Sequence, residues 1–263
     1  MPTYFLRDRA IVRLSPTDPD ENVGAFLQGL VTNDVEQDVC VYTALLSPQG
    51  KVLFDFFVEP EYVPVTNSKP DGPGYRKSGD FLIDCETSQA EALIRRLSLY
   101  RLRKAITIQL DRTLGVWWND QSRNDGWPDP RLPDFNLGHR GIAKLDPAAP
   151  DGSALFRQRR LKWGVCEGHA ELSDLLWLEC NAAELNGVSF TKGCYVGQEN
   201  TARMNWRAKV NRRLVVVPLA DSDPKRQRVA YPELGLAVDH RRVEDIVPEW
   251  RPAWMDLNHT EPQ

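Results

Sequence analysis

Two β-rich runs close together in the sequence constrain the fold more than any other feature of this chain. The runs cover residues 39–46 and 51–58, and only Ser47-Pro48-Gln49-Gly50 separates them. A four-residue connection that contains proline and glycine is typical of a β-hairpin. The spacing therefore predicts that these two strands pair antiparallel.

Strands and helices alternate along the rest of the chain. Strands are expected at residues 5–14, 80–85, 105–110 and 113–118, and helices behind Asp18, over 88–100 and over 153–163. Residues 60–80 and 119–134 are rich in proline and polar residues, which predicts surface loops. The tail from residue 210 is expected to form a small β domain. This mixture, with local antiparallel pairing, predicts an α+β fold.

Composition limits the class of protein. The chain has 263 residues, a net charge of -4 and no long uncharged apolar run, so neither general nucleic-acid binding nor a membrane span is expected. Charged residues follow Met1 too early for a signal peptide, which predicts a cytoplasmic protein, or a mitochondrial matrix protein if the source is eukaryotic. The five cysteines contain no Cys-x-x-Cys pair, which favours reduced thiols and no metal site.

The most informative segment is Lys192-Gly193-Cys194-Tyr195-Val196-Gly197-Gln198-Glu199. Its two glycines tolerate positive φ and let the backbone approach another group closely. The Lys192 ammonium would favour the Cys194 thiolate if the two groups were close in space. A buried structural cysteine is an equally good interpretation of the residues alone. The basic stretch after Thr201 is compatible with a polyanionic partner or with a solvated strand edge.

This motif, followed by Ala202 and Arg203, resembles the signature of YgfZ-type proteins, which are folate-binding relatives of the aminomethyltransferase T-protein. Three other stretches match that family in the same order, at residues 26–35, 46–53 and 184–190. The resemblance implies α+β segments around a central folate pocket in residues 1–209, and a small, possibly truncated β-barrel-like domain in residues 210–263.

The resemblance also implies a function. It suggests a tetrahydrofolate-binding accessory protein in iron-sulfur cluster assembly or repair, which supports iron-sulfur enzymes including those that modify transfer RNA. Its partners would be iron-sulfur client or assembly proteins, with no direct nucleic-acid partner and no membrane.

Site residues follow from the same resemblance. A carboxylate can accept two parallel hydrogen bonds from a pterin, and Glu179 occupies the matching place. Arg203 would bind the glutamate end of the folate, and Asn33 and Asp34 would line the opposite wall. Other expected contacts to the cofactor come from Gln28, Tyr195, Gln198 and Glu199, and Cys194 and Lys192 are expected to act at the pocket rim.

One departure from the T-protein pattern affects the expected chemistry. Where T-proteins resemble Gly-x-x-x-Asp-Asp, this chain has Phe54 followed by Asp55. A folate-dependent aminomethyltransferase or demethylase that uses Asp55 as general base is the alternative function.

Two further alternatives follow from the cysteines. One is a cysteine hydrolase that pairs Cys194 with His139 or His169. The other is cluster binding, suggested by the fourteen-residue spacing of Cys166, Cys180 and Cys194. Iron-sulfur ligands usually lie closer together in the sequence, so we interpret this spacing as coincidence.

Overall fold

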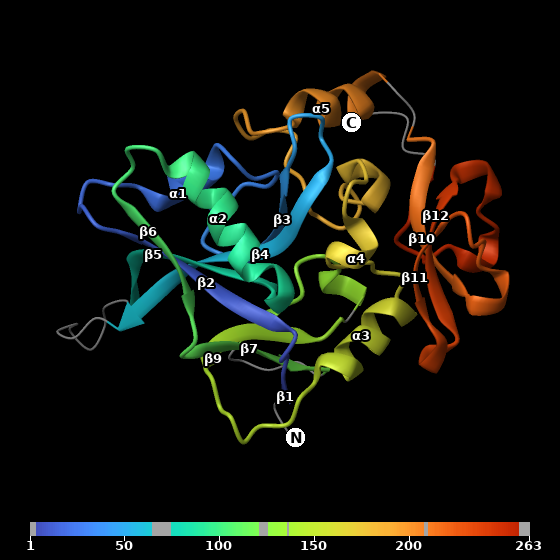
Figure 1. Cartoon of the computed structure of the whole chain (residues 1–263), viewed down its shortest axis with the longest axis horizontal. Helices are drawn as coiled ribbons and strands as arrows, with labels where there is room; N and C mark the ends of the chain where they lie inside the picture. The colour runs from blue at the N-terminus through green and yellow to red at the C-terminus, as the bar shows by residue number, and fades with distance from the viewer. Residues whose placement is uncertain (1–3, 65–74, 121–125, 136, 208–209, 258–263) are drawn as a thin grey trace.

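The computed structural model of the chain describes residues 4–64, 75–120, 126–135, 137–207 and 210–257. Within these ranges it contains three antiparallel sheets and five α-helices (Figure 1). No helix in the described ranges is both long enough and apolar enough to cross a membrane.

The largest sheet has five strands and contains the predicted hairpin. Its strand order is β3-β4-β5-β2-β6, and the hairpin pairs Ala44 with Asp55 in antiparallel register. The strands are β2 (Arg9–Pro16), β3 (Val41–Leu46), β4 (Val52–Pro64), β5 (Tyr75–Glu86) and β6 (Ile106–Asp111). Side chains alternate across a strand, so Asp55 and Phe57 of β4 point to one face while Phe56 and Val58 point to the other.

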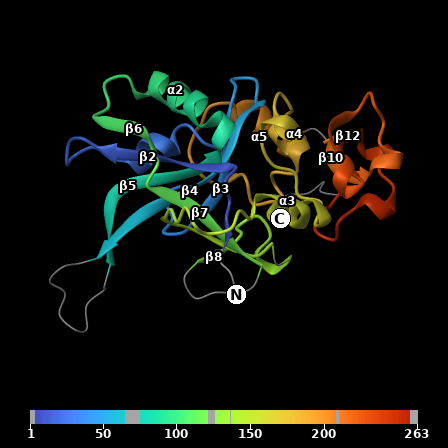
Figure 2. The same cartoon turned by 60° about the horizontal axis from the view of Figure 1, so that its bottom comes forward.

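Two helices cover one face of this sheet. They are α1 (Val23–Gln28) and α2 (Ala90–Arg101), and Figure 2 shows α2 on the outer side of the molecule, away from β7 and β8. Leu93 and Leu97 of α2 are fully buried in the resulting core. The helix ends in an unusual way, because Leu102 has φ +48° and ψ -110°. A non-glycine residue in such a conformation costs about 1–3 kcal/mol.

A four-stranded sheet covers the opposite face. Its order is β1-β7-β9-β8, made of β1 (Tyr4–Phe5), β7 (Leu114–Asn119), β9 (His139–Lys144) and β8 (Trp127–Pro128). Ile11 and Leu82 pack against Val116 and Trp118 between the two sheets, beside Phe156 of α3 (Ser153–Lys162). The five-stranded sheet is therefore the middle layer.

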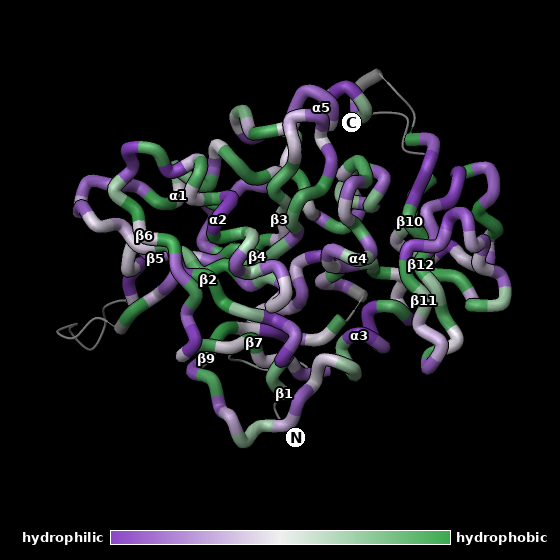
Figure 3. Tube along the Cα trace, viewed as in Figure 1, coloured by the Kyte–Doolittle hydropathy of each residue, from purple (hydrophilic) through white to green (hydrophobic). Residues whose placement is uncertain are grey.

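The C-terminal sheet has three strands in the order β10-β12-β11. Its strands are β10 (Arg212–Pro218), β11 (Gln227–Tyr231) and β12 (Leu236–Arg242). Two helices, α4 (His169–Leu172) and α5 (Gln198–Arg207), precede them in the chain. Leu214 and Val238 of this sheet share a core with Trp177 and Leu178. Figure 3 shows α5 as mostly hydrophilic, in contrast to the apolar strands of the interior.

Three expected boundaries were wrong. The first strand is divided, because β1 and β2 belong to different sheets. The first helix begins after Asn22, whose Oδ1 accepts a hydrogen bond of 2.9 Å from the Ala25 amide, and not at Asp18. The expected loop at residues 60–80 is partly a long hairpin. Tyr62 of β4 pairs with Lys77 of β5, and a bulge lies between Pro60 and Tyr62. Residues 65–74 lie outside the described ranges.

Sequence patterns missed β8, β9 and α5. The first two are short or polar, and α5 has too few apolar residues to show a helical stripe. Strands at 105–118, helices at 88–100 and 153–163, and a β-rich tail agree with the structure within a few residues.

Candidate functional site

Most of the 192–199 motif lies on what we call the signature loop, residues 188–197, and its last two residues begin α5. Lys192 fixes this loop to the end of α1. Its Nζ donates hydrogen bonds to the carbonyl oxygens of Gln28 (2.7 Å), Val31 (2.6 Å) and Asn33 (2.9 Å). The last carbonyls of a helix lack partners within the helix, and a lysine ammonium can supply them. Burial lowers the pKa of Lys192 to about 8.

Three other predicted residues lie at the same place. Gln28 Nε2 donates a hydrogen bond to Asp34 Oδ1 at 3.0 Å. The side-chain amide of Asn33 donates to the backbone carbonyls of Tyr42 (2.8 Å) and Asn186 (2.7 Å). The structure thus brings Gln28, Asn33 and Asp34 together with Lys192, as one polar cluster. These hydrogen bonds connect segments of the chain that are distant in the sequence.

The other end of the signature loop lies against the β3–β4 turn. Gly197 has φ +85°, and a Cβ there would lie 2.6 Å from the Ser47 carbonyl oxygen. Asn200 Nδ2 donates to the Gln49 carbonyl at 2.7 Å. Only glycine fits this close approach without strain. The loop is therefore held at both ends.

Replacing Gly197 by alanine is expected to destabilise the protein by about 2 kcal/mol or more, because positive φ and the clash with Ser47 add. Gly193→Ala is the matched control, since a Cβ at Gly193 meets nothing within 4 Å. Urea unfolding of both variants measures the difference. Equal stability of the two variants would contradict the close approach.

Cys194 is the exposed thiol of the chain. Cys85, Cys166 and Cys180 are buried, and Cys40 is half-buried. Burial raises the pKa of Cys85 to about 12 and the pKa values of the other three well above the usual thiol range. Cys194 is therefore the thiol that another molecule can reach.

Neighbouring motif residues have different surroundings. Tyr195 is buried beside Lys192, whose Nζ lies 5.3 Å from its ring centre. Gln198 begins α5 half-buried, and Glu199 and Arg203 are exposed on the same helix. The motif thus divides into buried residues that hold the loop and exposed residues that face solvent.

Glu179 lies elsewhere. Its Oε2 is 3.2 Å from Nε2 of His240 on β12, so it faces the C-terminal sheet. Among the described residues no contact joins Glu179 to Asp55 or to Arg203. Sequence reasoning placed these three residues around one ligand, whereas here they belong to three separate environments.

Asp55 is buried, with its side chain on the face of β4 opposite α1 and α2. Its Oδ2 accepts hydrogen bonds from the Tyr42 hydroxyl (3.1 Å) and the Gly168 amide (3.2 Å). Burial, and secondarily the nearby Glu167 carboxylate, raises the pKa of Asp55. A carboxylate so placed can hold a proton more easily than an exposed one.

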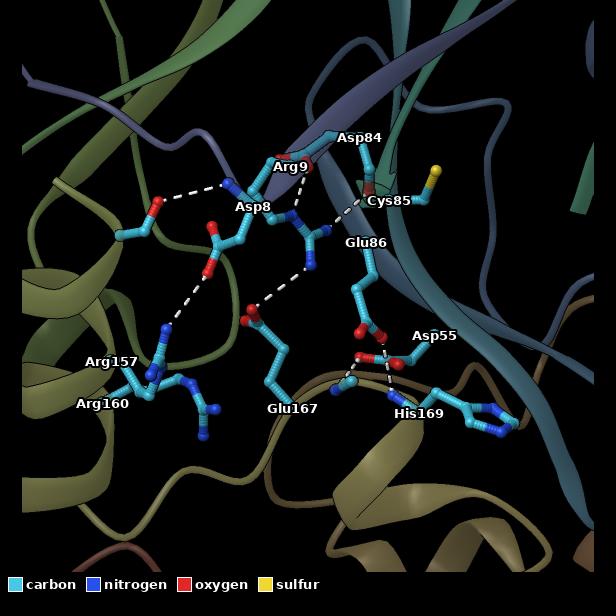
Figure 4. A network of polar contacts seen from close by, with 12 residues as sticks. Asp8, Arg9, Asp55, Asp84, Cys85, Glu86, Arg157, Arg160, Glu167 and His169 are labelled. Atoms are coloured by element: carbon cyan, nitrogen blue, oxygen red, sulfur yellow. Dashed lines mark hydrogen bonds and ion pairs between the residues drawn. The ribbon is translucent and has the colours of Figure 1, made fainter. Parts of the chain in front are cut away.

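A buried ion-pair network lies near Asp55 and joins the two larger sheets, and sequence reasoning missed it. Figure 4 shows three of its members, Arg9, Asp84 and Glu167. Arg9 Nε lies 2.6 Å from Asp84 Oδ1, and its Nη1 lies 3.2 Å from Glu167. Arg131 lies 2.5 Å from the other oxygen of Glu167. The six linked side chains, each at most 8% exposed, are Arg9, Asp84, Asp129, Arg131, Arg140 and Glu167. The available signal was Arg9 at the start of an apolar run in β2 and Asp84 within the apolar end of β5.

The residues around Asp55 do not fit a folate in this structure. The hollow beside Asp55 has a volume of about 10 Å³, which is room for one water molecule. The Arg131 guanidinium lies 5.2 Å from the ring centre of Tyr42 and 4.9 Å from that of Phe57, so it occupies the aromatic face. A pteridine ring there would have to displace these side chains.

The alternative chemistries gain no support from the geometry. His169 donates its backbone amide to Glu86, and among the described residues neither His169 nor His139 contacts Cys194. Cys166 and Cys180 are buried, and no group of three metal-binding side chains occurs in the described ranges.

Comparison with solved structures identifies the fold. The glycine cleavage system aminomethyltransferase T from Bartonella henselae matches with a TM-score of 0.61 and 11% identity, over 92% of this chain and 78% of that one. The predicted α+β, T-protein-like fold is thereby confirmed.

Comparison of sequences gives closer relatives, although no protein-family model matches. The mitochondrial "iron-sulfur cluster assembly factor IBA57 homolog" of Pyricularia oryzae is 32% identical over 93% of this chain and 63% of its own length. The human mitochondrial "iron-sulfur cluster assembly factor IBA57" is 30% identical over 84% of this chain and 67% of its own length. The chain spans about half to two thirds of the curated relatives that it matches. By sequence, the chain belongs to the IBA57 family of iron-sulfur cluster assembly factors.

Proposed function

We propose that this chain is an accessory protein in iron-sulfur cluster assembly or repair, and that it meets its partner proteins at the signature loop. The observation that carries the proposal is the exposed Cys194 on a loop held by Lys192 at one end and Gly197 at the other. Thiolates are the usual protein ligands of iron-sulfur clusters. One thiol cannot hold a cluster alone, so the remaining ligands must come from a partner.

The rigid loop suits such a role. A flexible loop would lose conformational entropy when a partner bound, whereas a loop that is already fixed loses little. The three hydrogen bonds of Lys192 supply this order without a ligand. Cys194 can then be presented in one orientation.

Removing the protein from its source organism tests the proposal. We expect the activity of iron-sulfur enzymes to fall while the abundance of their polypeptides is unchanged, and to return when the chain is expressed again. Transfer-RNA-modifying iron-sulfur enzymes, proposed as clients through the resemblance to YgfZ-type proteins, should be measured alongside. Unchanged activity of all these enzymes would overturn the proposal. The relatives are named as mitochondrial. We propose that this chain acts in the mitochondrial matrix if its source is eukaryotic, and in the cytoplasm otherwise.

Tetrahydrofolate is proposed as a ligand, and the T-protein-like fold is the observation that favours it. Because the described conformation leaves no room beside Asp55, binding would require Arg131 to move away from Tyr42 and Phe57. We therefore derive no one-carbon transfer from this site. Calorimetry with tetrahydrofolate tests the ligand: heat of binding that Asp55→Asn weakens would support it, and no heat at high micromolar concentration would remove it.

A further inference from the structure

The C-terminal end of α2 carries an unusual surface that the proposed function does not use. Leu99 is 68% exposed and Leu102 is 87% exposed, the two most exposed large apolar side chains of the described residues. Burial of leucine is normally favourable, so two leucines in water at one place require an explanation.

Basic residues surround these leucines. We call this surface the α2 patch, and it consists of Arg95, Arg96, Leu99, Arg101, Leu102, Arg103 and Lys104. Its nearby acids are Glu91 in the first turn of α2 and Glu21, which lies 3.1 Å from Lys104 Nζ. Arg101 also donates to the Ile106 carbonyl at 3.0 Å. The patch is therefore strongly positive on a chain whose net charge is -4.

Arg95 and Leu99 lie on the outer face of α2, and Leu102, Arg103 and Lys104 follow the end of the helix. Leu93 and Leu97 are buried against the five-stranded sheet, whereas Arg95 and Leu99 are exposed and lie four residues apart on the outer side. Figure 2 shows α2 at the outer surface of the molecule. No other described element covers it.

The backbone of Leu102 is strained, and its side chain projects into solvent. Its φ of +48° is a conformation that glycine adopts readily and leucine does not. A strained residue whose side chain is almost fully in solvent contributes nothing to the core, which favours a role in binding.

We propose that the α2 patch binds an anionic phospholipid surface, with Leu99 and Leu102 entering the interfacial region and the arginines contacting lipid phosphates. Leucines that project between basic residues are typical of interfacial membrane contacts. A fluid bilayer accepts projecting side chains without a matching pocket, and arginine can extend its charged end back to the headgroups. A protein partner would need an acidic, grooved surface, and leucine is uncommon among the residues that dominate such interfaces.

Vesicle co-sedimentation of the full chain tests this proposal. We expect at least tenfold stronger binding to vesicles of phosphatidylglycerol and phosphatidylcholine than to phosphatidylcholine alone, and a loss of binding in high salt. Arg95→Glu combined with Arg103→Glu should reduce binding to the anionic vesicles more than tenfold. Equal binding to neutral and anionic vesicles, or none to either, would overturn the proposal.

Leu102→Gly separates binding from folding. This variant should bind anionic vesicles about fivefold to tenfold more weakly, because buried apolar area is lost. Its thermal midpoint should not fall, because glycine relieves the positive φ. Leu155→Ala is the matched control, since Leu155 is 44% exposed on α3 outside the patch and its removal should leave binding unchanged.

Two other outcomes would also reject the membrane contact. If Leu102→Gly bound as well as the unaltered chain, the contact would be electrostatic only and no insertion would occur. If the chain ignored vesicles but bound polyglutamate, and the charge-reversed variant did not, the patch would serve an acidic protein. The proposal is independent of the role of Cys194, so its failure would leave the proposed function unaffected.

Discussion

Glu167→Ala is expected to destabilise the fold by about 3–5 kcal/mol, because removing one member of a buried ion-pair network leaves its partners buried and unpaired. Glu167 contacts both Arg9 and Arg131, and its side chain is only 8% exposed. Neighbouring elements cannot easily admit water to replace the carboxylate. Chemical denaturation of the full chain measures the loss.

Acid titration tests the same residue in a second way. The arginines, Arg131 first, hold the folded-state pKa of Glu167 well below its usual range despite burial. A carboxylate with a lowered folded-state pKa stabilises the protein above its unfolded pKa of about 4.3, and that stability is lost as the pH falls below this value. Glu167→Gln should therefore show a shallower loss of stability below that pH than the unaltered chain.

A surface pair provides the control for this prediction. Arg242 lies 2.9 Å from Glu244, and both side chains are more than half exposed. Glu244→Ala should leave stability unchanged within error. If Glu167→Ala behaved in the same way, the network would not contribute to the fold as inferred.

Cys194→Ser is expected to reduce the support of iron-sulfur enzymes to the level of a strain without the protein, a loss of at least about tenfold in rescued activity. Serine keeps the size of the side chain but removes the soft thiolate that iron-sulfur clusters prefer. Because Cys194 is exposed, the free energy of unfolding should not change. Enzyme activity in the complemented strain and urea unfolding of the purified variant are the two measurements.

Thr191→Ala is the matched control, because Thr191 is exposed on the same loop and its removal leaves the thiol in place. This variant should restore activity fully. Full rescue by Cys194→Ser would instead mean that the loop acts through its shape alone, and the thiol would lose its assigned role.

The fold was largely predictable from local patterns. The hairpin at residues 41–64, α2 and α3 all showed clear signals, because hydrophobic periodicity and turn residues act over short distances. The first strand was harder, because β1 and β2 join different sheets. Membership of a sheet depends on pairing between distant strands, which the local pattern does not contain.

The candidate site was predictable in its residues but less so in its arrangement. The motif pointed to Lys192 and Cys194, and family resemblance suggested that both act at a pocket rim. In the structure Lys192 instead donates to three carbonyls at the end of α1. Every residue has a backbone carbonyl, so the sequence does not indicate which carbonyls accept these hydrogen bonds.

The layer beside Asp55 shows the same limit. Arg131 and Glu167 are 36 residues apart, and nothing local marks either as a partner of the other. The loss of one of these charges is costly to stability because they are buried, whereas the same charges on the surface would contribute little to the free energy of unfolding. The space expected for a ligand is filled by these side chains, and only their packing could reveal that.

By itself, the sequence determined the α+β class, the antiparallel hairpin and the segment on which Cys194 lies, because turn chemistry, periodicity and a dense motif are local properties. Only the tertiary structure decided that Cys194 is exposed while the other four cysteines are buried or half-buried, that Asp55 is buried against Tyr42 and Gly168, and that Leu102 projects into solvent. Exposure and pairing depend on which distant segments come together, and that is set by the packing of the whole chain.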